Sequence, residues 1–219
     1  MADRLRIALW RVRQDGVLAL RSGLLGPPFG RPDPAASQLA DDPHLGFLNN
    51  PHPELETSRL RLRALDLPDL DRLIELFEPE PGKDLAAPRY WTVEYILLRE
   101  LLTANHTWII QLKATGECLG HCGVTEMQID GVIEPEIGYR VGERYQGQGY
   151  ATEAACAVRD YLFRQGVHRV ISAIAADNIA SQRVALKNGM HREKRAEWQG
   201  RSVEIYAADR VSAEHPLSE

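Results

Sequence analysis

The alternation of apolar and charged positions predicts a sheet protein whose regular part begins near residue 57. The segment "SRLRLRAL" (58–65) alternates leucine with arginine, which is typical of a strand with one buried face. Asp130 and Gly131 separate two apolar segments and favour a tight hairpin turn. Further segments predict strands at residues 106–113, 118–128, 132–141 and 167–175, and the last two strands, 190–198 and 202–210, form a hairpin that turns at "QGR" (199–201).

Segments with apolar residues three and four positions apart predict helices between these strands. They are residues 66–77, 92–104, 151–166 and 178–189. Gly166 and Gly189 are typical stops for the last two helices. Antiparallel hairpins therefore flank a single crossover around residues 133–175. This order predicts a mixed α/β (α+β) sheet and excludes a doubly wound nucleotide-binding fold.

The first 54 residues differ from the rest of the chain. Residues 4–20 have apolar positions at roughly helical spacing, which predicts a short amphipathic helix, and a Pro/Gly-rich arm follows. The arm is either a partly ordered extension or a segment that packs on the domain or on a second subunit. Its aromatic residues favour docking. We therefore divide the chain into an extension (1–54), a folded domain (55–211) and a tail (212–219).

Composition narrows the class of protein. Hydrophobic residues make up 44% and charged residues 26%, as in soluble globular proteins. The net charge of -5 argues against a nucleic-acid partner, and no apolar run approaches the roughly 20 residues that span a membrane. The three cysteines, Cys118, Cys122 and Cys156, fit a reducing compartment. We expect a cytoplasmic protein with structural thiols, no metal site and no membrane partner.

The segment "RYQGQGYATEA" (144–154) places two glycines where a helix starts. The first N–H groups of a helix have no partner within it and attract anions, above all phosphate. Gly147 and Gly149 would let a phosphate approach the backbone, and Arg144 would add charge-assisted hydrogen bonds. A ligand-free glycine turn is an equally ordinary reading. Neither standard nucleotide-binding motif is met. The turn lacks the lysine and Ser/Thr of a Walker A loop, and Thr152 stands where G-x-G-x-x-G needs its third glycine.

Four segments in the same order and spacing resemble the GNAT N-acetyltransferase superfamily. They are "ETSRLRLRAL" (56–65), "EIGYRV" (136–141), "RYQGQGYATEA" (144–154) and "NIASQRVALKNGM" (178–190). The third matches the R/Q-x-x-G-x-G/A acyl-CoA signature. Within the superfamily the chain looks like the RimJ/RimL group, which includes enzymes that acetylate ribosomal-protein N-termini. The resemblance implies a mostly antiparallel twisted sheet of about seven strands, flanked by helices and splayed at its central parallel pair.

The resemblance also implies acetyl-CoA as the cosubstrate. Main-chain N–H groups of residues 146–151 would hold its pyrophosphate, and the edge of the strand at residues 139–141 would pair with its pantetheine arm. Asn178 would lie near the pantetheine arm or the acetyl end; a plain helix N-cap is an equal reading, and the two roles are compatible. The implied cofactor-binding residues are Tyr139, Val141, Arg144, Gln146, Gly147, Gln148, Gly149, Tyr150, Ala151, Thr152 and Asn178.

The implied reaction is direct attack of a neutral amine on the thioester in a ternary complex. Glu136 is the first candidate for the general base, and Glu134 shares its strand face as the backup. The alternative is a carboxylate that positions the amine or pairs with an arginine. Many relatives protonate the thiolate with a tyrosine at the position of Ala185. Ser181 is the candidate in its place, or an ordinary first-turn serine.

Several points stay open at this level. His121 is either a substrate contact or an ordinary strand residue. The acceptor is a protein N-terminal α-amine or a small amine such as an antibiotic, a polyamine or an amino acid. A non-catalytic module that binds acyl-CoA is a third reading, and the protein is a monomer or a homodimer.

Overall fold

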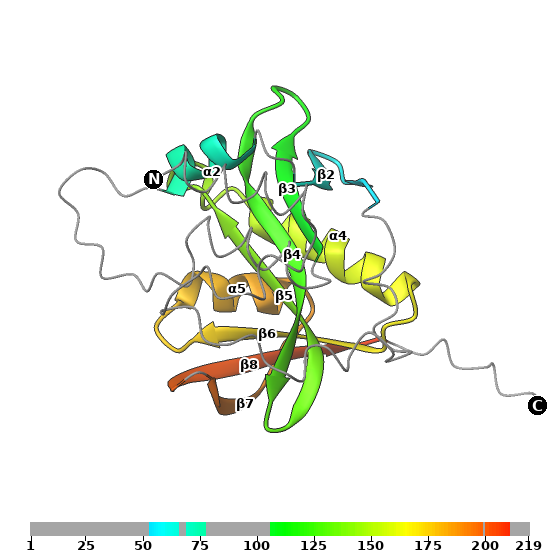
Figure 1. Cartoon of the computed structure of the whole chain (residues 1–219), viewed down its shortest axis with the longest axis vertical. Helices are drawn as coiled ribbons and strands as arrows, with labels where there is room; N and C mark the ends of the chain where they lie inside the picture. Colours follow the sequence, from blue (N-terminus) through cyan, green and yellow to red (C-terminus); the bar gives the residue numbers. More distant parts are fainter. Residues whose placement is uncertain (1–52, 66–68, 78–105, 199, 211–219) are drawn as a thin grey trace, which may run out of the picture.

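The computed structural model describes residues 53–65, 69–77, 106–198 and 200–210 (Figure 1). Most of the predicted extension (1–54), the predicted helix at 92–104 and the tail (212–219) lie outside the described residues.

The described strands form a single twisted sheet (Figure 1). Its order is β1-β2-β3-β4-β5-β6-β8-β7, and each neighbouring pair is antiparallel except β5 and β6. The mixed, mostly antiparallel sheet is confirmed, with the two-residue β1 added to the predicted seven strands. The strands are β1 (Leu55–Glu56), β2 (Leu60–Ala64), β3 (His106–Leu112), β4 (Cys118–Ile129), β5 (Val132–Val141), β6 (Arg169–Ala175), β7 (His191–Trp198) and β8 (Arg201–Asp209).

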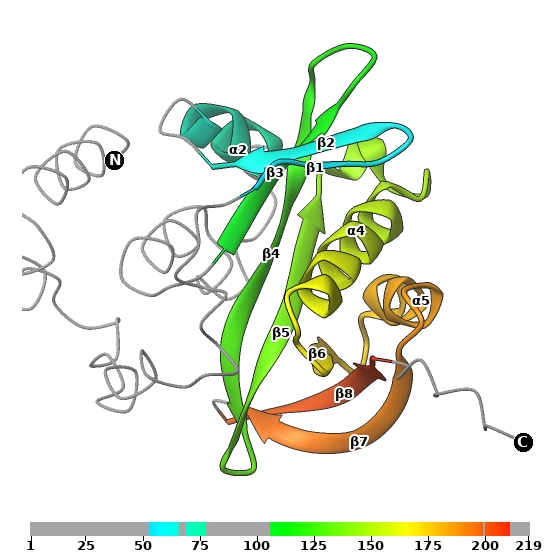
Figure 2. The same cartoon turned by 90° about the vertical axis from the view of Figure 1, so that its right-hand side faces the viewer.

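Helices cover both faces of the sheet. Figure 2 shows α4 (Tyr150–Arg164) and α5 (Ile179–Lys187) on one face and α2 (Asp69–Phe77) on the other. The helix α4 buries one stripe of small and branched residues against the sheet, where Trp108 meets Tyr161 edge to face at 5.8 Å. A 3-10 turn, η6 (Glu143–Tyr145), separates β5 from α4; the sequence predicts no such turn.

The two parallel strands at the centre of the sheet diverge. β5 and β6 pair at Glu136 and Ile171, and no further register pair joins them in the described part of the chain. Ser172 Oγ donates to the Ile137 carbonyl oxygen at 2.7 Å and closes the junction. Beyond it, β5 stays paired with β4 up to Gly120 and Val141. This fork confirms the splay that the family resemblance implies.

Close packing of β4 against β5 fixes the fork at the C-terminal end of β5. Gly120 has a φ of 151°, and a Cβ on it would lie 2.0 Å from the Arg140 carbonyl oxygen. Any larger residue must therefore push β5 away from β4, because main-chain atoms do not yield like a flexible side chain.

We expect Gly120→Ala to lower the free energy of unfolding by more than about 3 kcal/mol, since strain and overpacking each cost roughly 1–3 kcal/mol. Gly131→Ala is the matched control, because Gly131 also has a positive φ, 82°, but a Cβ there meets no atom within 4 Å. The control is expected to lose about 1–2 kcal/mol. Chemical denaturation measures both, and equal losses would contradict the close approach.

Candidate active site

The glycine turn adopts a backbone conformation that needs glycine. Gly149 is the N-cap of α4 with a φ of 83°, and Gly147 has a φ of 74°. Both values lie in the left-handed region that side chains disfavour. A Cβ on Gly147 would meet nothing within 4 Å, and one on Gly149 would meet Arg59 Nη2 at 3.4 Å. The predicted helix start after the glycine turn is confirmed, with α4 beginning at Tyr150, one residue before the predicted range.

The N-terminus of α4 carries unused hydrogen-bond donors. No side chain caps it, and the first main-chain bond of the helix runs from the Glu153 N–H to the Gly149 oxygen at 3.0 Å. The predicted set of donors, residues 146–151, is wrong at its first member, because the Gln146 N–H donates to the Glu143 oxygen at 3.1 Å. The main-chain N–H groups of residues 147–152 have no hydrogen-bond partner among the described residues. With the partial positive charge of the helix dipole, they form a site for an anion.

Side chains of the turn fold back on its own backbone. Gln146 Nε2 donates to the Val141 carbonyl oxygen at 3.1 Å, and Gln148 Nε2 donates to the Arg144 carbonyl oxygen at 3.2 Å. The guanidinium of Arg144 lies over the ring of Tyr145 at 4.7 Å. The exposed Arg144 thus stands beside the anion site, and the turn is fixed from within.

Beyond the fork, no described strand pairs with β5 on the side away from β4. The Gly142 N–H donates to the Leu119 oxygen at 2.9 Å. Because antiparallel ladders alternate, the main-chain groups of Tyr139 and Val141 point away from β4, toward the space where β6 has diverged. The anion site and this open edge lie at the same end of β5.

The two candidate carboxylates differ in their surroundings. Glu136 lies at the β5–β6 junction, 7% exposed, and Thr125 Oγ1 donates to its Oε2 at 3.4 Å. Its side chain lies on the face opposite α4, since its neighbour Ile137 packs in the core with that helix. Glu134 is held by Arg169, whose Nε donates to its Oε1 at 2.5 Å. Glu134 therefore has the alternative role that the sequence predicts for a carboxylate here, which is to pair with an arginine.

Comparison with known proteins decides the family. The model of the acetyltransferase (GNAT) domain matches residues 59–191, which include the glycine turn and the fork. The chain belongs to the GNAT acetyltransferase family. The Bacillus subtilis protein YkkB, whose function is uncharacterised, is 36% identical over 166 residues, covering 72% of this chain and 96% of YkkB.

Solved GNAT structures share the fold. An acetyltransferase from Agrobacterium tumefaciens superposes with a TM-score of 0.59 at 25% identity, covering 72% of this chain and 95% of its own. RimL, a ribosomal L7/L12 alpha-N-protein acetyltransferase in complex with coenzyme A, gives a TM-score of 0.56 at 24% identity, covering 72% and 98%. The protein is thus an N-acetyltransferase of a family that uses acetyl-CoA.

Two residues predicted for the site, Asn178 and Ser181, lie at the start of α5. Asn178 Oδ1 accepts from the Ser181 N–H at 3.1 Å, so Asn178 is the N-cap of α5. The hydroxyl of Tyr139 donates to the Ser181 carbonyl oxygen at 2.9 Å and ties β5 to α5. Burial, followed by Cys122 and Glu136, raises the pKa of Tyr139, which keeps the phenol protonated as a donor. The sequence places Tyr139 in the site through its backbone and does not predict this bond.

The position that holds tyrosine in many relatives faces the core. Ala185 is 0% exposed and packs in the main hydrophobic cluster with Met190. The hydroxyl of the half-buried Ser181 has no hydrogen-bond partner among the described residues. Of these two residues, Ser181 is therefore the one that carries a proton donor.

His121 lies on β4, buried, with its ring edge-on to Phe77 at 5.8 Å. Burial, reinforced by the charge of Arg140, lowers its pKa to about 4. It is therefore neutral near pH 7, and its Nε2 has no hydrogen-bond partner in the described part of the protein. A substrate contact through His121 stays a prediction.

Sequence reasoning missed the contact between the β1–β2 turn and α4. Thr57 Oγ1 donates to Glu153 Oε1 at 2.5 Å, and Ser58 Oγ and the Arg59 N–H donate to the same oxygen. Burial would raise the pKa of Glu153, but these hydrogen bonds and those of the Arg59 side chain outweigh it and hold the pKa below 4.5. Both segments carry the family resemblance, which was the available signal.

Three further findings concern the described residues alone. They contain no group of three or more His, Cys, Asp or Glu side chains that could hold a metal ion. None of their helices is long and apolar enough to cross a membrane. The three cysteines are free thiols.

The cap of α5 is open to a direct test. We expect Asn178→Ala to lower the free energy of unfolding by about 1 kcal/mol, because the Ser181 N–H loses its acceptor. Asn178→Asp keeps the accepting oxygen and is expected to retain the stability. Urea denaturation measures both variants, and an equal loss in both would contradict capping by Oδ1.

Proposed function

We propose that the protein transfers the acetyl group of acetyl-CoA to the N-terminal α-amine of a protein. The observation that carries the proposal is the uncapped N-terminus of α4 beside the unpaired edge of β5. A ligand with a diphosphate at one end and amide groups along its arm matches both features.

The diphosphate would accept hydrogen bonds from the main-chain N–H groups of residues 147–152, with added charge from Arg144. The amides of pantetheine would pair with the main chain of β5. Gln146 already donates to the Val141 carbonyl oxygen, so the Val141 N–H and the main chain of Tyr139 are the groups left for this pairing. Asn178 uses Oδ1 as the cap, and its Nδ2 donor would face the arm.

The acceptor amine would approach from the other side of the sheet. Glu136 lies at the fork on the face opposite α4. We propose that Glu136 is the general base, which accepts the proton that the ammonium group must lose before attack. The neutral nitrogen then bonds to the thioester carbon, the carbon–sulfur bond breaks, and a main-chain N–H of β5 stabilises the developing oxyanion. The nitrogen loses a second proton as the amide forms, and the leaving thiolate takes up one proton, which balances the step. The Ser181 hydroxyl would donate a hydrogen bond to this thiolate.

A protein acceptor is supported by the solved structures that share the fold. They include RimL, a ribosomal L7/L12 alpha-N-protein acetyltransferase, and RimJ from Mycobacterium smegmatis, with a TM-score of 0.51 at 22% identity. At these identities the likeness concerns the fold, so the acceptor has to be identified by experiment.

The acceptor is identified by incubating the protein with acetyl-CoA and an amine panel and measuring released thiol. We expect turnover with N-terminal peptides and none when their α-amine is blocked. Turnover of polyamines, antibiotics or amino acids without turnover of peptides would overturn the acceptor assignment. Binding of CoA without thiol release from any amine would indicate a non-catalytic module.

Glu136→Gln tests the assigned base. We expect kcat to fall by about 10²–10⁴, since positioned proton transfer contributes a factor of this size. Glu134→Gln is the matched control, because Glu134 shares the strand face but is held by Arg169. Its kcat is expected to stay within about threefold of wild type, well below that contribution. The assignment fails if Glu136→Gln matches the wild-type rate at every pH.

A further inference from the structure

The turn that joins β1 to β2 surrounds one carboxylate at the start of α4. Glu153 accepts from Thr57 Oγ1 (2.5 Å), Ser58 Oγ (3.1 Å) and the Arg59 N–H (2.9 Å), while Arg59 Nε donates to its second oxygen at 2.7 Å. The side chain of Glu153 is 16% exposed. So many donors on one sheltered carboxylate fix the position of the turn against the first residues of α4.

Arg59 also reaches the glycine turn itself. Its Nη1 donates to the Gln148 carbonyl oxygen at 3.0 Å, and its guanidinium lies over the Tyr150 ring at 4.5 Å. A Cβ on Gly149 would lie 3.4 Å from Nη2. One side chain therefore contacts Gln148 and Tyr150 on either side of Gly149, in the segment whose N–H groups form the anion site.

The β1–β2 turn is itself anchored on its other side. Lys113 Nζ donates to the Thr57 carbonyl oxygen at 2.7 Å, and the Lys113 N–H donates to the Arg59 carbonyl oxygen at 2.9 Å. Arg59 thus extends from a rigid support, the end of β3, to a turn whose two glycines adopt a positive φ.

Arg59 has an electrostatic effect as well. A carboxylate in the first turn of α4 suits the helix dipole but repels an incoming phosphate. The guanidinium of Arg59 pairs with Glu153 at 2.7 Å and balances this charge. Removal of Arg59 would therefore loosen the glycine turn and leave a negative charge beside the anion site.

We propose that Arg59 is a positioning residue for acetyl-CoA. It holds Gln148 and Tyr150 so that the N–H groups of residues 147–152 converge on the diphosphate, and it offsets the charge of Glu153. The inference rests on the proposed function, because it requires the diphosphate to bind at this turn.

Calorimetric titration of the full chain with CoA tests the inference without an acceptor. We expect Arg59→Ala to raise the Kd roughly tenfold and the KM for acetyl-CoA by a similar factor, with kcat at saturation nearly unchanged. Arg59→Lys keeps the positive charge next to Glu153 but loses the branched guanidinium that also reaches Gln148, so its Kd should rise by about threefold.

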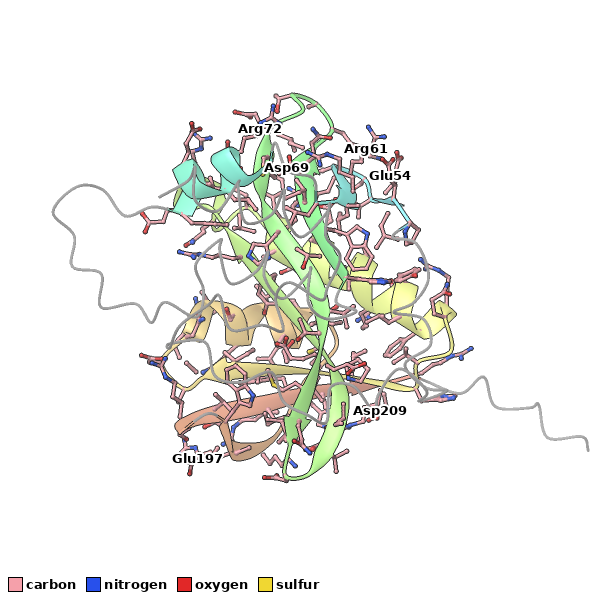
Figure 3. All side chains as sticks on the ribbon, viewed as in Figure 1. Glu54, Arg61, Asp69, Arg72, Glu197 and Asp209 are labelled. Atoms are coloured by element: carbon pink, nitrogen blue, oxygen red, sulfur yellow. The ribbon has the colours of Figure 1, made fainter. Side chains whose placement is uncertain are left out.

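Arg61, which lies in β2 two residues after Arg59, provides a matched control. It pairs with Glu54 at 2.7 Å and is 46% exposed, against 44% for Arg59. Figure 3 shows Arg61 and Glu54 side by side at the margin of the molecule. We expect Arg61→Ala to change the Kd for CoA by less than about twofold and the thermal unfolding temperature only slightly, because Arg61 pairs with Glu54 rather than with the glycine turn and exposed pairs contribute little.

The outcomes separate the two proposals. If the wild-type protein does not bind CoA, the proposed function fails. If it binds CoA and Arg59→Ala binds equally well, or Arg61→Ala loses as much affinity, the role of Arg59 is wrong. If Arg59→Ala does not fold, Arg59→Lys is the deciding variant. Wild-type affinity for CoA in Arg59→Lys would contradict the role of the Arg59 guanidinium.

Discussion

The main-chain N–H groups of residues 147–152 need acceptors that the described part of the protein does not supply. The contrast with α5 is informative, because Asn178 caps that helix with its own side chain. At α4 the residue before the helix is Gly149, which has no side chain to cap with and whose φ of 83° turns the chain into the helix. An end left in this state stabilises an anion at no cost in broken protein hydrogen bonds. The rest of the site is arranged around that end.

The fork between β5 and β6 repeats the same logic in a strand. Main-chain groups at Tyr139 and Val141 face a neighbour that has turned away after Glu136 and Ile171. The unpaired edge and the uncapped helix lie one after the other along the chain, joined by η6. One extended ligand can therefore satisfy both. Glu136 lies at the inner end of this edge, at the junction of β5 and β6. We place the reacting carbon there.

Local patterns predicted much of this arrangement. The glycines of the segment 144–154 located the start of α4, and the alternation of apolar residues located the strands of the crossover. Sequence patterns were less informative about contacts between distant segments. Arg59 and Glu153 lie 94 positions apart, and Glu134 and Arg169 lie 35 apart. No periodicity connects such pairs, so the anchoring of the glycine turn and the pairing of the backup carboxylate became visible in the folded chain.

The central claim is that the start of α4 receives the diphosphate of CoA. Backbone amide NMR of the full chain during titration with CoA measures this directly. We expect the amides of residues 147–152 to shift most, downfield as they gain phosphate acceptors, while those of the distant β7–β8 hairpin stay in place. Saturable binding of CoA that leaves the amides of residues 147–152 unshifted would contradict it.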